Sequence, residues 1–237
     1  FMMALNPQIT KSYASGDKDT AFKLACRGCR FSFYIMYVLA LPIMIESHQI
    51  LKLWLGTPPN GAYIFMFWTI LSSFAVLLGN TLVTLQMAHG HIRYYQFWIT
   101  VFGSVPFPLT WIAFKMGLPA VYSYYIFVLV YWGLIFVRYY LVHNMTGIPA
   151  SMYLGGVVLK THVVGLLACI IPTLVFCYMQ ECILRLFFVV FASLCSSVSI
   201  IFLLGLDQTE RVFFKEKIIS SIRTIKRIYT SEVSKIN

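Results

Sequence analysis

The sequence predicts an all-α integral membrane protein whose six transmembrane helices pair as antiparallel hairpins. Three observations lead to this class. Of the 237 residues, 59% are hydrophobic and only 11% are charged, whereas a soluble domain carries about 25% charged residues. Six apolar stretches each approach the ~20 residues that a helix needs to cross a bilayer. The polar connections between these stretches are short, so consecutive helices are expected to run in opposite directions.

The chain opens with an apolar fragment, residues 1–5, which we interpret as the last turn of a spanning helix. We therefore expect the sequence to be a fragment. Residues 6–30 are polar and basic and are predicted to form a cytoplasmic loop. Near the middle of this loop, Asp17 or Asp19 is predicted to cap a helix that begins at Thr20.

Six membrane spans are predicted between residues 31 and 206. The apolar runs place them at 31–53, 62–87, 94–114, 120–141, 161–178 and 186–206. Proline removes a backbone donor and obstructs the preceding helical turn. Kinks are therefore expected at Pro42, Pro106, Pro108 and Pro172. Because two prolines fall in the third span, that span should be bent or locally unwound.

Residues 207–237 form a charged tail that is predicted to be an amphipathic helix. Apolar residues recur at intervals of three or four from Phe214 to Tyr229, which places them on one helix face. Lysines and arginines lie mostly off that face, as in helices that bind the membrane surface. Contact with anionic lipid on the cytoplasmic side follows from this pattern, and a solvated tail is the alternative.

The distribution of basic residues predicts the orientation. Fifteen of the eighteen lysines and arginines fall in alternate segments, beginning with residues 6–30 and ending with the tail. The other three, Lys52, Lys115 and Arg185, fall in the intervening segments. Because positive charge collects in cytoplasmic loops, residues 6–30 and the C-terminus are expected in the cytoplasm. Membrane topology thus accounts for the net charge of +10, and we expect no nucleic-acid partner.

No pattern of cysteine or histidine predicts a metal site or a bound cofactor. Cys26 and Cys29 have CxxC spacing, but no second pair completes a zinc site. His89 and His91 lack a carboxylate or cysteine nearby in the sequence. The cysteines are therefore expected to be free thiols in a reducing compartment.

Several loops carry a family pattern. The segment from Asn6 to Asp17, NPQITKSYASGD, resembles the cytoplasmic loop after the eighth helix of bacterial polysaccharide flippases. That family belongs to the superfamily that also holds the multidrug and toxic-compound extrusion (MATE) transporters and the lipid II flippases. Three further stretches are similar: Pro42 followed by Leu53-Trp54-Leu55-Gly56, the loop from Met87 to Tyr94, and Gly205-Leu206 followed by Glu210-Arg211.

The resemblance implies a two-lobe transporter of which this chain supplies the last six helices and the end of the helix before them. Its function would be to flip an undecaprenyl-diphosphate-linked oligosaccharide across the bacterial inner membrane. The implied partners are the lipid-linked oligosaccharide, membrane lipids and a coupling ion, H⁺ or Na⁺. No enzymatic activity is expected.

Three residues within the spans are candidates for the substrate pathway. Glu46 is the one acidic residue within a predicted span, and a charge near the bilayer centre costs ~2.5–3.5 kcal/mol on insertion scales. It is expected either at the outer rim near Lys52 or at a polar contact or coupling site. Asn80, beside Gly79, either hydrogen-bonds another helix or contacts sugar hydroxyls. Arg138 either anchors the topology or pairs with the lipid diphosphate.

Two alternative functions remain open. A cation-coupled multidrug exporter of the same fold would place carboxylates deep in a lobe, where this chain offers only Glu46. A membrane glycosyltransferase or polysaccharide polymerase would need acidic or histidine residues in a sizeable outer loop. The predicted outer loops are short, and Glu181 is their only acidic residue.

Overall fold

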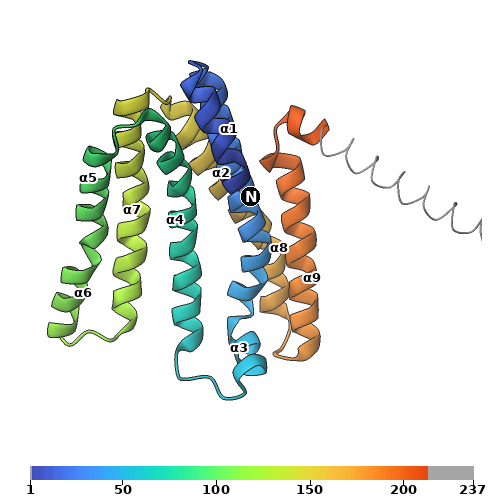
Figure 1. Ribbon diagram of the computed structural model, residues 1–237. Helices are drawn as coiled ribbons and strands as arrows, with labels where there is room; N and C mark the ends of the chain where they lie inside the picture. The colour runs from blue at the N-terminus through green and yellow to red at the C-terminus, as the bar shows by residue number, and fades with distance from the viewer. Residues whose placement is uncertain (1, 213–237) are drawn as a thin grey trace, which may run out of the picture.

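The polypeptide folds into a bundle of long helices (Figure 1). The computed structural model describes residues 2–212, and every regular element in that range is helical. Six of the described segments are long and apolar enough to cross a membrane: Lys18–Ile45, Ala62–His89, Ile92–Lys115, Val121–Thr146, Ser151–Tyr178 and Ile183–Gly205. Many large apolar side chains point outward from these segments, as lipid-facing surfaces require. The chain is therefore an all-α, multi-pass membrane protein.

The second and fourth spans agree closely with the prediction. They correspond to α4 (Ala62–His89) and α7 (Val121–Thr146). Each stops at a glycine, Gly90 or Gly147, whose backbone is left-handed. Glycine adopts that conformation without the steric penalty of a Cβ, so these two residues end their helices.

The N-terminal region is more helical than predicted. Residues 6–30 were expected to form a loop with a helix only from Thr20, and this expectation is wrong for residues 6–14, which are helical. Helix α1 covers Met2–Ala14, and α2 runs from Lys18 to Ile45, so the connection between them is three residues long. Asp17 caps α2, since its side chain accepts a hydrogen bond from the Thr20 N–H at 3.1 Å. One of the two predicted caps is thereby confirmed, although the helix begins before Thr20.

Burial explains why the polar segment is helical. Phe22, Ala25, Cys26 and Cys29 of α2 occupy positions i, i+3, i+4 and i+7, and all four are buried. Lys18 and Lys23 of the same segment are exposed. The apolar face of the helix therefore begins before the first predicted span. Counting charged residues alone does not detect this face.

Two spans are divided into separate helices, and Pro106 directly follows the break in one of them. The third span divides at Val105 into α5 (Ile92–Ser104) and α6 (Pro106–Lys115), which confirms the predicted bend. The first span divides at Glu46, four residues after Pro42, where α2 ends and α3 (Ser47–Leu55) begins.

The fifth span begins earlier than predicted. A π-helical segment, η1 (Ser151–Leu159), leads directly into α8 (Lys160–Tyr178). Gly155 and Gly156 suggested a loop, yet both lie within η1. Because Tyr153 of this segment is 1% exposed, its packing outweighs the low helix propensity of the glycines. Pro172 lies inside α8 without ending it.

The last span consists of α9 (Ile183–Ile200) and a π-helical segment, η2 (Ile201–Gly205). Helical residues resume at position 208. The amphipathic helix predicted from Phe214 onward lies outside the described residues.

Helix α2 lies at the centre of the bundle. It contacts α1, α4, α8 and α9. On one side, α4 packs against α7, which also contacts α5 and α6 at the edge of the bundle (Figure 1). On the other side, α8 and α9 form a hairpin. Phe33 of α2 and Phe74 of α4, with ring centroids 4.9 Å apart, belong to the buried cluster that joins the two sides.

The connections alternate between the two ends of the bundle (Figure 1). The α1–α2, α4–α5 and α7–η1 connections and residues 206–212 lie at one end, which we name the basic end. The α3–α4, α6–α7 and α8–α9 connections lie at the opposite end. Of the twelve lysines and arginines among the described residues, eight lie near the basic end, Lys52, Lys115 and Arg185 lie near the opposite end, and Arg138 lies within its span.

Candidate functional site

A buried ion pair joins the break between α2 and α3 to the first turn of α9. Glu46 is 1% exposed. Its two carboxylate oxygens accept hydrogen bonds from Nε and Nη2 of Arg185 at 2.8 and 3.0 Å. Lys52, which the sequence suggested as a neighbour, is exposed and forms no ion pair within residues 2–212. The charge of Glu46 is thus balanced by an arginine that sequence reasoning had assigned only to a loop.

Groups around Arg185 hold this pair in place. The guanidinium carbon lies 4.4 Å from the ring centroid of Phe176, and the Arg185 N–H donates to Sγ of Cys182 at the start of α9. A second, exposed contact joins the same two regions, because Nδ1 of His48 lies 3.2 Å from Oε1 of Glu181. The opposite end is therefore closed by polar contacts between α2–α3 and the α8–α9 hairpin.

Arg138 lies on α7 where that helix passes closest to α4. A Cβ on Gly79 would meet Cδ of Arg138 at 2.9 Å, so the glycine provides the space that the arginine occupies. The guanidinium also lies near the buried hydroxyl of Tyr95. No carboxylate in the described part of the chain pairs with Arg138. It is a half-buried cation within a span and has no counter-ion there.

Asn80 occupies the same level of the bundle but a different face. Its neighbour Gly79 contacts Arg138, whereas Asn80 is exposed, and its side chain forms no hydrogen bond to any described residue. The structure therefore brings two sequence candidates, Asn80 and Arg138, to one level. Glu46 lies apart from them, toward the opposite end.

Beside Arg138, one backbone carbonyl connects three segments. The Tyr153 hydroxyl donates to the carbonyl oxygen of Leu78 at 2.8 Å, and the Cys29 thiol donates to the same oxygen at 3.5 Å. These contacts fix η1 and α2 against α4. Sequence reasoning missed Tyr153 because the glycines that follow it suggested a loop, although its apolar neighbours favoured a buried helix.

An apolar groove of about 380 Å³ lies among α2, α4, α7 and α8. Two of its polar groups are already engaged: the Tyr37 hydroxyl donates to the Gly165 carbonyl at 2.6 Å, and Nδ1 of His162 contacts the Val158 carbonyl. Such a lining suits a hydrocarbon chain better than a sugar. The apolar and aromatic wall includes Phe33, Leu41, Phe67, Phe74, Trp132 and Leu166.

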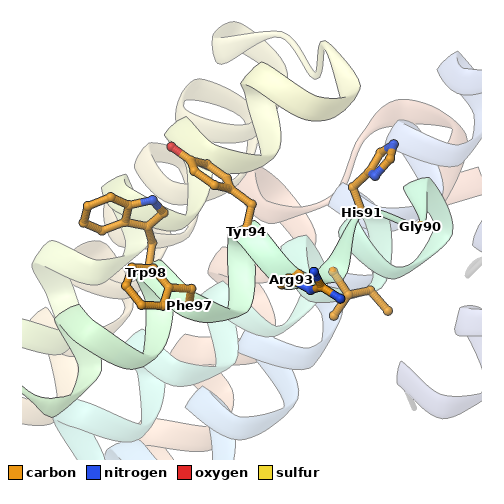
Figure 2. Close-up of a pocket in the computed structure, with 7 residues that line it drawn as sticks. Gly90, His91, Arg93, Tyr94, Phe97 and Trp98 are labelled. Atoms are coloured by element: carbon orange, nitrogen blue, oxygen red, sulfur yellow. The ribbon is translucent and has the colours of Figure 1, made fainter.

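A second pocket, of about 810 Å³, opens at the basic end where α4 turns into α5 (Figure 2). We name it the α5 pocket. Arg93 is its only full charge, and Tyr94, Phe97 and Trp98 supply aromatic rings. Among the described residues, no three His, Cys, Asp or Glu side chains gather to hold a metal ion here or elsewhere.

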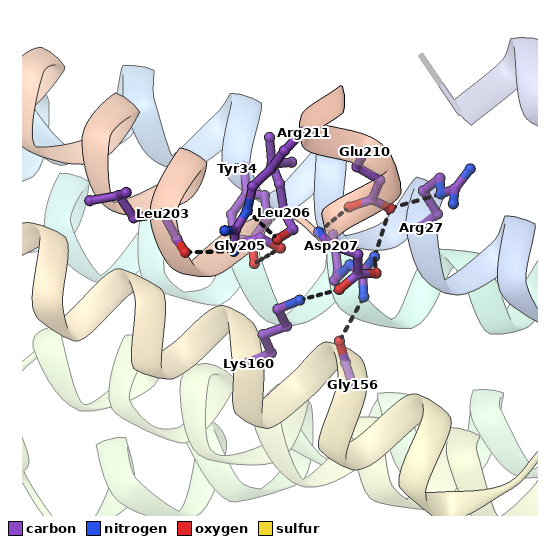
Figure 3. A network of polar contacts seen from close by, with 11 residues as sticks. Arg27, Tyr34, Gly156, Lys160, Leu203, Gly205, Leu206, Asp207, Glu210 and Arg211 are labelled. Atoms are coloured by element: carbon purple, nitrogen blue, oxygen red, sulfur yellow. Dashed lines mark hydrogen bonds and ion pairs between the residues drawn. The ribbon is translucent and has the colours of Figure 1, made fainter. Parts of the chain in front are cut away.

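A network of ion pairs at the basic end ties α2 and α8 to the segment after η2 (Figure 3). Arg30 binds Asp207 at 2.6 Å and Glu210 at 2.8 Å. Arg27 reaches Glu210 at 2.8 Å, and Lys160 reaches Asp207 at 2.6 Å. Two carboxylates thus share three cations, and residues just before the tail are anchored to the bundle.

Comparisons with protein-family models, with curated proteins and with solved structures found no match to this chain.

Proposed function

We propose that this chain is part of a transporter that flips an undecaprenyl-diphosphate-linked oligosaccharide across the bacterial inner membrane for surface polysaccharide synthesis. The observation that carries the proposal is that one membrane bundle contains both an apolar groove and an arginine, Arg138, that has no counter-ion among the described residues. Trp132 lines the groove, and Arg138 follows it by six residues on α7, or ~9 Å toward the basic end. A ligand with a long apolar chain and an anionic diphosphate has the chemistry that this pair of features recognises.

Breaks in the spanning helices support the proposal, because flipping a lipid requires the helices to bend. A sugar head group loses its water in hydrocarbon at a cost of several kcal/mol for each unpaired hydroxyl, on the order of 4–8 in the least polar media. A flippase must therefore change shape to offer a polar route. The breaks at Val105 and Glu46 are places where helices can bend. The sequence from Asn6 to Asp17, which resembles a cytoplasmic loop of the flippases, supports the same conclusion, although residues 6–14 belong to α1 in this structure.

A cation-coupled drug exporter is less well supported. That function needs a carboxylate that is free to exchange a proton or sodium ion within the lobe. Glu46 lies at the break between α2 and α3, and Arg185 already binds both of its oxygens. If H⁺ or Na⁺ drives transport, the coupling site is expected in another part of the transporter or requires this pair to open.

Deletion of the gene tests the proposal. Lipid-linked oligosaccharide should accumulate in the inner leaflet, and surface polysaccharide should fall to background. The measurement is the amount of surface polysaccharide together with the fraction of lipid-linked sugar that a periplasmic glycosidase can reach. Unchanged export in the deletion strain would contradict the flippase assignment.

Complementation of that strain tests the role of Arg138. Arg138→Gln should lower export, because the diphosphate loses its cation, whereas Arg138→Lys should retain part of it. Lys115→Gln is the matched control, since Lys115 is a cation near the opposite end that lies over the ring of Trp111. Equal export by Arg138→Gln and the control, at equal amounts of protein in the membrane, would exclude a role for Arg138.

A further inference from the structure

The α5 pocket holds a cation that has no counter-ion among the described residues. Arg93 is exposed in the first turn of α5. The carboxylates that form ion pairs in the described part of the chain are committed elsewhere: Glu46 to Arg185, Glu181 to His48, and Asp207 and Glu210 to the network at the basic end. Arg93 forms no hydrogen bond or ion pair with any described residue. Arg93 is therefore an exposed cation without a described partner in the lining of the pocket (Figure 2).

Aromatic rings continue from Arg93 along α5 toward the middle of the span. Tyr94 and Phe97 are 61% and 60% exposed. Trp98 is half-buried, and its ring centroid lies 6.3 Å from that of Tyr94 and 5.5 Å from that of Phe97. Phe102 stacks on Trp98 one turn further, at 5.9 Å. An exposed cation at the end of a membrane span is thus followed by a series of aromatic rings, of which Tyr94, Phe97 and Phe102 are exposed.

This order matches the order of groups in a membrane phospholipid. The head-group phosphate lies at the interface, where a span ends, and the acyl chains extend from it into the apolar layer. Arginine pairs with phosphate through charge-assisted hydrogen bonds, and tyrosine and tryptophan are favoured at this depth. The positive end of the α5 dipole adds to the attraction for an anion.

The charge of the chain's own tail argues against that tail as the occupant. Residues 213–237 carry six lysines and arginines and two glutamates, so the tail has the same sign as Arg93. We propose that the α5 pocket binds the phosphate head group of an anionic glycerophospholipid, with Arg93 as the phosphate ligand and Phe97 and Trp98 as the surface for its acyl chain. This site is separate from the groove and from Arg138, and it does not depend on the identity of the transported substrate.

Native mass spectrometry of the purified full chain tests this site. The protein is titrated with phosphatidylglycerol or phosphatidylcholine, and the retained lipid is counted. Arg93→Gln should lower phosphatidylglycerol retention about five-fold, whereas Arg93→Lys should restore most of it. Lys115→Gln, at the other end of the same α5–α6 span, should retain phosphatidylglycerol as the unmodified chain does.

Three results would overturn the proposal. The first is equal retention of phosphatidylglycerol by Arg93→Gln and the unmodified chain, and the second is an equal loss in Lys115→Gln. The third is release of the lipid by millimolar inorganic phosphate, which would show that the pocket recognises free phosphate and not a lipid. Retention of phosphatidylcholine should be low and insensitive to Arg93, because its head group has no net charge.

Discussion

The two ends of the bundle use ion pairs in different ways. At the opposite end, one carboxylate meets one guanidinium: the side chains of Glu46 and Arg185 are 1% and 10% exposed. At the basic end, Asp207 and Glu210 share three cations, and the exposure of the partners ranges from 3% to 47%. Both arrangements join α2 to residues more than 130 positions later in the chain.

The buried pair and the network differ in which charges stay unpaired after one side chain is removed. Breaking a buried pair leaves a charge without compensation in a medium of low dielectric constant, which is strongly destabilising. In the network, Arg30 keeps one carboxylate when the other is removed, and Arg27 and Lys160 can reach water. We infer that the opposite end depends mainly on the buried Glu46–Arg185 pair, since the His48–Glu181 contact is exposed, and that the basic end depends on several replaceable contacts.

Glu46→Gln should have the largest effect on stability. Arg185 would remain buried without a carboxylate, and the free energy of unfolding should fall by about 3–5 kcal/mol. The measurement is equilibrium unfolding in mixed micelles. Lys52→Gln, an exposed cation at the same end, serves as the control and should change little. A double variant, Glu46→Gln with Arg185→Gln, should be more stable than Glu46→Gln alone, because no unpaired charge is left.

The same variant also tests the candidate coupling role of Glu46. If the pair opens during transport, the Glu46→Gln protein should show altered dependence on H⁺ or Na⁺. Full transport with unchanged ion dependence would leave Glu46 as a purely structural residue.

Glu210→Gln should have an intermediate effect. Glu210 accepts hydrogen bonds from Arg27, Arg30 and the backbone N–H of Asp207. The amide keeps one acceptor oxygen, and Asp207 still neutralises Arg30, so a loss of about 1.5–3 kcal/mol is expected. Glu181→Gln, in the exposed pair with His48, should cost less than about 1 kcal/mol. A loss at Glu210 equal to that at Glu46 would contradict the distinction between the two ends.

Hydropathy predicted the six spans because length and composition suffice to identify a membrane helix. Hydropathy did not predict where the first and fifth spans begin, because packing extends these helices into charged or glycine-containing sequence. Residues 18–30 contain charges, yet Phe22 and Cys29 bury one face of α2. Likewise, the glycines after Tyr153 obscured a helix that the burial of this tyrosine stabilises. In both cases a contact with another helix stabilises the local helix. The sequence pattern of one segment gives no information about that contact.

The contacts of the candidate site were harder to predict than its residues. Glu46 was identified as exceptional because it is acidic and lies within an apolar run. Its partner Arg185 lies 139 residues away, and only the packing of α9 beside α2 brings them together. Asn80 was expected to hydrogen-bond another helix or to contact sugar hydroxyls. The close contact is made instead by its neighbour Gly79, beside which Arg138 lies, and this depends on the rotation of α7 against α4.

Asp207→Asn should have the smallest effect, and that effect should depend on pH. Burial raises the pKa of Asp207, but the hydrogen bond from Lys160 and the charge of Arg30 outweigh it, so the pKa is lowered overall. A carboxyl whose pKa is lower in the folded state stabilises the fold above its ordinary value of about 4 and loses this contribution as the pH falls through the folded-state value. Since the side chain is 47% exposed, the contribution at neutral pH should stay below about 1 kcal/mol.

The thermal unfolding midpoints of the unmodified chain and Asp207→Asn, measured from pH 7 to pH 3, give this contribution as a difference. The difference should be constant above pH 5 and should shrink below about pH 4. Because the comparison subtracts the titration of all other groups, a difference that stays constant to pH 3 would mean that Asp207 does not contribute as a charge. Adding Lys160→Gln to both proteins should reduce the difference at neutral pH but not remove it, since Arg30 still pairs with Asp207. A difference abolished by that single change would show that one contact, and not a shared network, holds the basic end.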